Sequence, residues 1–226
     1  MKETQIEQML AQLRVKLLIM CAETDLALDA ACESLRLGDK DKAMSVVVGD
    51  TAINNLENEI DELALSILAR TQPVAQDLRF VVAALRMVIE LERIGDEAAN
   101  IAEYCLHLDG QFPDPIRVAL LPVLLTALEL YRSAVDIFSS SDSDRALALC
   151  RSGDRASRLE LNSLHGIMDY LNTDSHNVGD RPARAAMNGI LALHALHRIC
   201  RRAVNIGEHV YFIAKGLNIK HSLNAG

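Results

Sequence analysis

Residues 91–103 read LERIGDEAANIAE, and a related stretch, LHRICRRAVNIGE, follows at residues 196–208. The two stretches share Leu, Arg, Ile, Ala, Asn, Ile and Glu at the same spacing. Such a match indicates an internal duplication, and repeats of this kind decide the fold class before any single helix does. Each half of the chain is therefore expected to fold as one copy of the same unit.

The two copies differ at a pair of positions that carry chemistry. The first copy holds Glu92 and Asp96, four residues apart, whereas the second copy holds His197 and Arg201 in their places. A carboxylate can ligate a cation, but a guanidinium carries a permanent positive charge and cannot. The two halves are therefore expected to differ in the kind of site they can form.

The composition favours a helical, soluble protein. Of the 226 residues, 50% are hydrophobic, only 4% are aromatic, and the formal net charge is −8. Ala, Leu, Ile, Val, Glu, Arg and Asp dominate, which favours helix over sheet. The negative charge argues against binding to nucleic acid, since phosphate backbones repel acidic surfaces. The polar N-terminus lacks the pattern of a signal peptide, and no uncharged apolar run is long enough to span a membrane, so a cytoplasmic protein is expected.

Helical periodicity predicts six helices, and the linker at residues 109–115 separates them into two triplets. The predicted spans are about 6–35, 39–69, 73–107, 116–138, 144–171 and, after a polar break at 172–182, 183–215, with Pro73 in the first turn of the third helix. Short connections favour antiparallel neighbours. We therefore predict an all-α fold of two pseudo-symmetric three-helix bundles, at residues 1–110 and 116–217, followed by a flexible tail at 218–226. The five cysteines form no CxxC pair and are expected to be buried free thiols.

Two predicted helices of the first half each carry a stripe of oxygen-bearing side chains. The stripes comprise Asp50, Asn54, Glu57 and Asp61 on one helix, and Glu92, Asp96, Asn100 and Glu103 on the other. Helical periodicity puts each set on one face, and antiparallel packing would bring the two sets together. Clustered oxygens suit hard cations. The alternative is that the stripes are simply solvated faces, although close apolar neighbours and the repulsion between like charges favour a cation.

This pattern resembles the PhoU family of phosphate regulators. The resemblance rests on residues 91–96 and 100–103, on PVAQDLRF at 73–80 and on Gly49-Asp50, with weaker matches at Gly153-Asp154 and 205–208. It implies two three-helix bundles, each able to hold iron, zinc, manganese or magnesium through E(D)xxxD motifs. Carried over by position, Glu92 and Asp96 match one such motif, Glu57 and Asp61 fit the same spacing, and Asp50 lies on the same stripe.

The resemblance also implies a function. The family consists of cytoplasmic negative regulators, not enzymes, that couple the ATPase of a phosphate ABC transporter to a membrane sensor histidine kinase. They repress the phosphate-starvation response when phosphate is plentiful. A homodimer is expected, with membrane association only through these partners and no role for nucleic acid.

The second half departs from the family pattern. With His197 and Arg201 in place of the acids, the second metal site is expected to be lost. One interpretation is that Arg201 pairs with Asp154 or Glu208 and fills the volume of a cation. Another is that two of Arg198, Arg201 and Arg202 form an anion site. His194 and His197, three residues apart, could also ligate a transition metal, but two histidines alone are a weak signal.

Other classes of function fit the sequence less well. A di-iron enzyme of the ferritin type needs Glu-x-x-His pairs, and none is present. There is no GxSxG motif for hydrolysis and no glycine-rich phosphate loop. Two alternatives stay open, namely an accessory regulator of a secondary phosphate transporter and a helical adaptor without metal.

Overall fold

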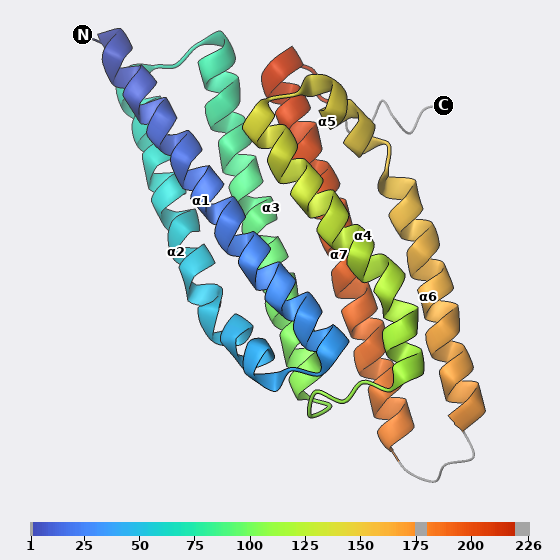
Figure 1. Ribbon diagram of the computed structural model, residues 1–226. Coiled ribbons are helices and arrows are strands. Elements are labelled where there is room, and N and C mark those ends of the chain that lie inside the picture. The colour runs from blue at the N-terminus through green and yellow to red at the C-terminus, as the bar shows by residue number, and fades with distance from the viewer. Residues whose placement is uncertain (1, 175–179, 220–226) are drawn as a thin grey trace.

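The computed structural model describes residues 2–174 and 180–219, and these ranges contain helices and no strand (Figure 1). The helices are α1 (Lys2–Leu37), α2 (Lys40–Thr71), α3 (Ala75–Leu106), α4 (Asp114–Ser140), α5 (Ser143–Cys150), α6 (Gly153–Asp174) and α7 (Arg181–Lys215). The prediction of an all-α, two-bundle fold is confirmed. The predicted tail at 218–226 falls mostly outside the described residues.

The bundles meet along α3 and α7. Helices α1, α2 and α3 pack together, helices α4, α6 and α7 pack together, and α3 lies against α7 between the two groups. In Figure 1, α1 and α4 lie in front of this central pair, with α2 and α6 at the two sides. α3 is central because Phe80, Ala84, Leu91, Ala98 and other residues are buried on more than one face of it. The duplication in sequence thus becomes a pair of long buried helices packed against each other.

Helix ends follow local sequence. Gly38 and Gly216 end α1 and α7 with φ of 73° and 72°, in the left-handed region that favours glycine. Asp39 caps α2 by accepting from the Lys42 amide, and Asp142 caps α5 by accepting from the amides of Asp144 and Arg145. These ends keep the connections short, as antiparallel packing requires.

Two predicted boundaries are wrong. Pro73 lies before α3 and not in its first turn. The helix begins at Ala75, and Val74 before it is extended, with φ −126° and ψ 162°. The fifth predicted helix is divided into α5 and α6 at Arg151 and Ser152. There the amides of Arg151 and Ser152 donate to Ala148 and Leu149, three residues back, which closes α5 as a tight turn. The apolar spacing runs through this turn, so periodicity alone did not reveal it.

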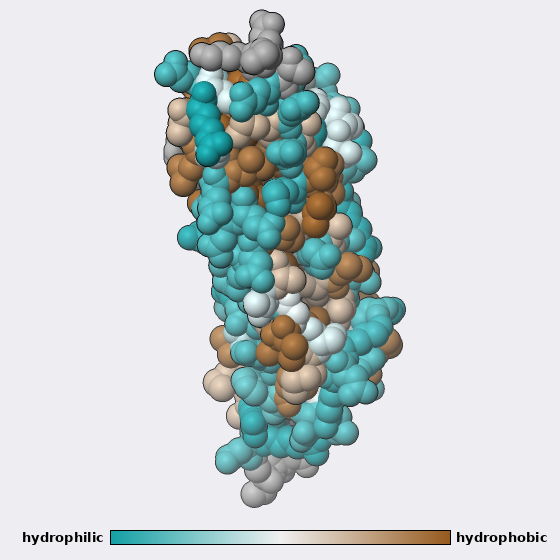
Figure 2. Space-filling model, turned by 90° about the vertical axis from the view of Figure 1, so that its left-hand side faces the viewer, coloured by the Kyte–Doolittle hydropathy of each residue, from teal (hydrophilic) through white to brown (hydrophobic). Residues whose placement is uncertain are grey.

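The exterior is charged, with scattered apolar residues. Figure 2 views the side formed by α1 and α2 and shows hydrophobic patches broken by hydrophilic atoms. α4 is long and apolar enough to cross a membrane by length and composition, but 44% of its most apolar window is buried in the bundle. Its inner face, including Leu120, Val123, Ala127 and Tyr131, packs into the core, as expected for a core helix of a helical bundle.

Candidate metal centre

The five acids predicted to bind metal lie across the packed pair α2 and α3. Asp50, Glu57 and Asp61 come from α2, and Glu92 and Asp96 come from α3. Acids on the two helices lie close enough to change each other's ionisation. Asp50 of α2 raises the pKa of Asp96, and Glu57 of α2 raises the pKa of Glu92. All but Asp96 are half-buried, and Asp96 lies at the exposed edge. The antiparallel packing thus brings the two predicted stripes near each other.

A glycine lets the two helices approach at this point. A methyl group built on Gly95 would lie 2.8 Å from Ile53 Cδ1 and 3.7 Å from Asp50 Oδ1. A side chain at Gly95 would therefore displace the end of the Ile53 side chain. The small residue in the 91–96 motif thus makes room for Ile53 of α2, close to Asp50.

The acids are partly buried and lie near one another, so both burial and the repulsion between their charges raise their pKa values. Burial and the nearby Asp96 and Glu57 raise the pKa of Glu92 to about 7. Burial and Asp50 raise the pKa of Asp96, and a hydrogen bond links Asp96 to Glu92. Burial, Asp61 and Asp96 raise the pKa of Glu57, while Arg93 opposes the effect. A cation at this place would remove the repulsion that a shared proton now relieves.

Among the five acids, Asp50 has a buried carboxylate oxygen that lacks a hydrogen bond. Its Oδ2 accepts a hydrogen bond of 3.0 Å from Asn54 Nδ2. Its Oδ1 is buried and has no hydrogen-bond partner. A buried carboxylate oxygen without a partner is costly, and a metal ion is one group that can satisfy it. The donor set therefore fits an oxygen-preferring cation by its chemistry.

The five carboxylates do not converge on a single position that could hold an ion. In the described part of the chain, no three His, Cys, Asp or Glu side chains are grouped so that they could hold a metal ion as they stand. The outer part of the α3 stripe also diverges, since Asn100 donates to Glu97 at 3.4 Å and Glu103 is exposed. A cation would have to draw the carboxylates inward by rotation of their side chains.

In the metal-free protein, the free energy of unfolding should depend on the protonation of Glu92. A pKa of about 7 in the folded state against 4.5 in the unfolded state means that the folded state binds the proton more tightly. The Glu92 contribution to stability is therefore full below about pH 4.5 and is lost as the pH rises to about 7. Urea unfolding in the presence of a chelator, from pH 4.5 to 8, measures this. Glu92→Gln should lose this decline, whereas a variant with an unchanged pH profile would contradict the assignment.

In the second repeat, His197 has an ionic partner at the position of Glu92, whereas Arg201, at the position of Asp96, is exposed. His197 Nδ1 lies 2.8 Å from Glu160 Oε2, and His194 Nδ1 lies 2.9 Å from Glu160 Oε1. Arg201 is exposed, and no ion pair found among residues 2–174 and 180–219 involves it. The predicted pairing of Arg201 with Asp154 or Glu208 is therefore not among the ion pairs of the described residues, and Arg201 is exposed on α7.

Two ion pairs that sequence reasoning missed join the repeats. Arg198 makes two hydrogen bonds to Glu97, of 2.5 and 2.6 Å. Arg202 and Asn205 both donate to Glu90, at 3.2 and 3.0 Å. Because Arg198 and Arg202 are occupied by α3 carboxylates, the predicted anion site is not supported. No sequence signal pointed to these pairs, because the paired residues are more than 100 positions apart.

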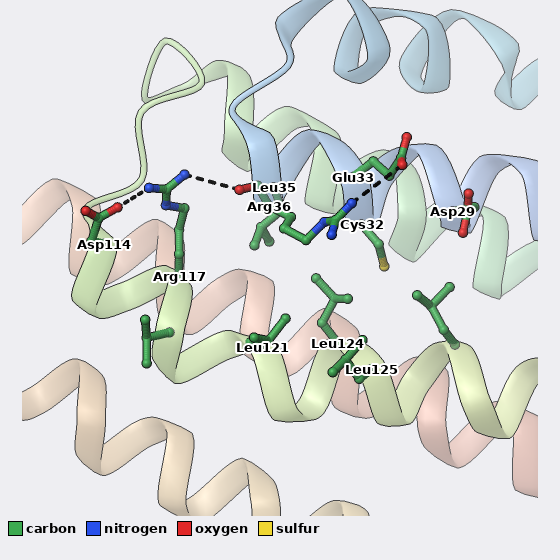
Figure 3. A pocket seen from close by; sticks show the side chains of 12 residues that line it. Asp29, Cys32, Glu33, Leu35, Arg36, Asp114, Arg117, Leu121, Leu124 and Leu125 are labelled. Carbon is green, nitrogen blue, oxygen red and sulfur yellow. Dashed lines mark hydrogen bonds and ion pairs between the residues drawn. The ribbon is translucent and has the colours of Figure 1, made fainter.

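A groove of about 730 Å³ lies between α1 and α4, away from the acids. Figure 3 shows Leu121, Leu124 and Leu125 facing it, and its charged rim is largely self-paired, with Arg117 bonded to Asp114 and Arg36 near Glu33. The groove thus has an apolar wall and a rim of mostly paired charges. It has no part in the candidate metal centre.

Fold and site together define a duplicated all-α bundle protein with a carboxylate cluster between two helices of its first repeat. Comparison with known proteins specifies the family. The PhoU domain model matches residues 17–105, within the first repeat. A phosphate-specific transport system accessory protein PhoU homolog from Pseudomonas putida is 32% identical over 94% of this chain and 81% of its own length. Homolog 1 from Thermotoga maritima is 31% identical over 92% and 87%.

Solved structures agree with the sequence comparison. The crystal structure of PhoU from Pseudomonas aeruginosa superimposes with a TM-score of 0.86, at 31% identity, covering 93% of this chain and 99% of that one. The chain belongs to the PhoU family. The family resemblance seen in the sequence is thereby confirmed.

Proposed function

We propose that the protein is an accessory regulator of phosphate uptake that acts beside a phosphate-specific ABC transporter. The observation that carries this proposal is the likeness, over 94% of the chain, to a relative named as a phosphate-specific transport system accessory protein. In this proposal the protein is no enzyme. It is a cytoplasmic homodimer, and it reaches the membrane only through the transporter ATPase and a sensor histidine kinase, whose starvation response it represses.

A metal ion at Asp50, Glu57, Asp61, Glu92 and Asp96 is part of the proposal. The unpartnered Asp50 oxygen and the raised pKa of Glu92 support it, because both describe negative charge without a counter-ion. When bound, the ion would hold α2 and α3 together. By mass action it would stabilise whichever conformation presents the ligands best, and so would stiffen a surface for docking.

The test measures two things, namely binding to the transporter ATPase and repression of the starvation response in cells. The transporter ATPase is captured on the immobilised protein in Mn²⁺ or in chelator, using the natural chain and Asp96→Asn. We expect capture by the natural chain to fall on chelation, and the variant to give the lower level in both buffers. In cells lacking the natural gene, the chain should restore phosphate-dependent repression of a starvation reporter. No capture together with no repression would overturn the proposed role.

A metal-free adaptor is the second candidate, favoured by one observation. The ion pairs of Arg198 and Arg202 already hold the repeats together, and no three donors converge among the described residues. Capture that is equal in Mn²⁺ and in chelator, with repression intact in Asp96→Asn, would favour this candidate. Regulation of a secondary phosphate transporter would appear as restored repression without capture of the ATPase.

A further inference from the structure

The outer face of α4 carries a row of apolar side chains that is largely open to solvent. Val118, Leu121 and Leu125 are 70%, 38% and 55% exposed, and the partly buried Leu128 continues the row. All four line the groove between α1 and α4, together with the buried Leu124 (Figure 3). Apolar residues that are exposed side by side, rather than singly, indicate a surface that binds another protein.

The spacing of this row is that of a seam between two helices. Residues 118, 121, 125 and 128 follow steps of three, four and three, which are the steps between the a and d positions of a heptad pattern. At 1.5 Å per residue the row extends along α4 for about 15 Å, or roughly three helical turns. The partner that suits it best is therefore another helix lying along α4.

The row also matches an antiparallel copy of itself. A two-fold axis midway between Leu121 and Leu125 puts Leu121 opposite Leu125 of the second copy, and Val118 opposite Leu128 of the second copy. The next residue of the row at one end is Asp114, and at the other end it is Arg132. Both are nine positions from the axis, so these opposite charges also face each other across it. Such self-complementarity is what a symmetric dimer requires.

The charges at the two ends of the groove have opposite net sign. One end holds three cations and two carboxylates joined in ion pairs, namely Arg36, Lys42 and Arg117 with Glu33 and Asp114. At the other end Arg132 pairs with both Asp25 and Asp29, at 3.0 and 2.6 Å. The first cluster thus has one net positive charge and the second has one net negative charge. An antiparallel copy brings unlike clusters together, whereas a parallel copy would set like against like.

We propose that the groove between α1 and α4 is the surface through which two copies of this chain form an antiparallel, two-fold symmetric dimer. The two α4 helices lie side by side in this dimer, and the α1 helices flank them. The inference rests on the homodimer of the proposed function and names the surface that forms it. The carboxylate cluster between α2 and α3 has no part in this surface, so the dimer and the metal can be tested separately.

The test measures the mass of the full chain in solution by sedimentation velocity at a series of protein concentrations. We expect the natural chain to dimerise. Leu125→Glu should weaken dimerisation by more than about 100-fold, because it buries a carboxylate in an apolar seam and the symmetry makes each substitution count twice. The double variant Leu121→Lys, Leu125→Glu should recover most of this loss, because opposite charges then meet twice across the axis. Recovery requires that positions 121 and 125 face each other, so it tests the antiparallel register.

Leu65→Glu is the matched control, because Leu65 is a comparably exposed leucine of α2 outside the groove, and it should leave dimerisation unchanged. Circular dichroism checks that each variant folds. If Leu125→Glu does not fold, Val118→Glu replaces it, because Val118 is the most exposed residue of the row.

The outcomes separate this inference from the proposed function. If Leu125→Glu dimerises as well as the natural chain, the inference is overturned and the homodimer stands on another surface. If the double variant stays monomeric, the antiparallel register is overturned. A natural chain that is monomeric would overturn both the inference and the homodimer, and loss of ATPase capture by Leu125→Glu would then assign the groove to the transporter. The proposed regulation is measured by capture and by repression in cells, so its failure is a different result.

Discussion

Asp96→Asn is expected to weaken Mn²⁺ binding by more than about 100-fold, because it removes one of the carboxylates that would ligate the ion on α3. The exchange preserves the size of the side chain and removes only its charge. In the metal-free protein the same change should relieve the repulsion that Asp50 exerts on Asp96, so stability should not fall. Titration calorimetry and the Mn²⁺-induced shift in melting temperature measure the two effects separately.

The matched control for this prediction is Asp154→Asn in the second repeat. Asp154 is the counterpart of Asp50, is exposed, and lies on α6 far along the chain from the acids of the first repeat. It should leave Mn²⁺ binding unchanged. If Asp96→Asn kept half or more of the bound Mn²⁺, the carboxylates of the first repeat would not be the binding site.

Arg198→Ala should destabilise the fold by about 2 kcal/mol. Removing one partner of a buried ion pair typically costs about 3–5 kcal/mol, and we expect less here because the Arg198 side chain is 45% exposed. The physical reason is Glu97, which is only 7% exposed and would be left with a buried, uncompensated charge at the contact between α3 and α7. Urea unfolding at neutral pH measures the change.

A double variant and a surface control sharpen this prediction. Adding Glu97→Gln to Arg198→Ala should recover about 1 kcal/mol or more, because it removes the buried charge. Arg155→Ala removes the same side chain from an exposed pair with Glu129, at 3.4 Å, and should change stability by less than about 0.5 kcal/mol. Equal effects of Arg198→Ala and Arg155→Ala would show that the contact between the repeats does not depend on this pair.

Most of the fold was predictable because helical periodicity is a local property of the sequence and because the duplication shows that one folding unit occurs twice. The ends predicted for the first and last helices, at about 35 and 215, lie close to the ends of α1 at Leu37 and of α7 at Lys215, and all five cysteines are buried as expected. Burial raises the pKa of the Cys21 and Cys200 thiols to about 12. The break at Arg151 was missed because a tight turn can close a helix without proline or a change in apolar spacing.

The site was less predictable, for a geometric reason. Spacing put Glu92 and Asp96 on one face of a helix, and antiparallel packing then brought Asp96 near Asp50 and Glu92 near Glu57. The unpartnered Asp50 oxygen and the ion pairs of Glu90 and Glu97 depend instead on how α2 and α7 rotate against α3. These pairs join residues more than 100 positions apart, and sequence spacing says nothing about such a rotation.

The most direct test of the account is a crystal structure of the protein grown with Mn²⁺, with an anomalous difference map calculated at a wavelength where manganese scatters anomalously. We predict a peak between α2 and α3, within coordination distance of Asp50, Glu92 and Asp96, with Glu57 and Asp61 turned toward it. A map without a peak there, and with these carboxylates directed into solvent, would contradict the claim that the first repeat assembles its oxygens around a cation.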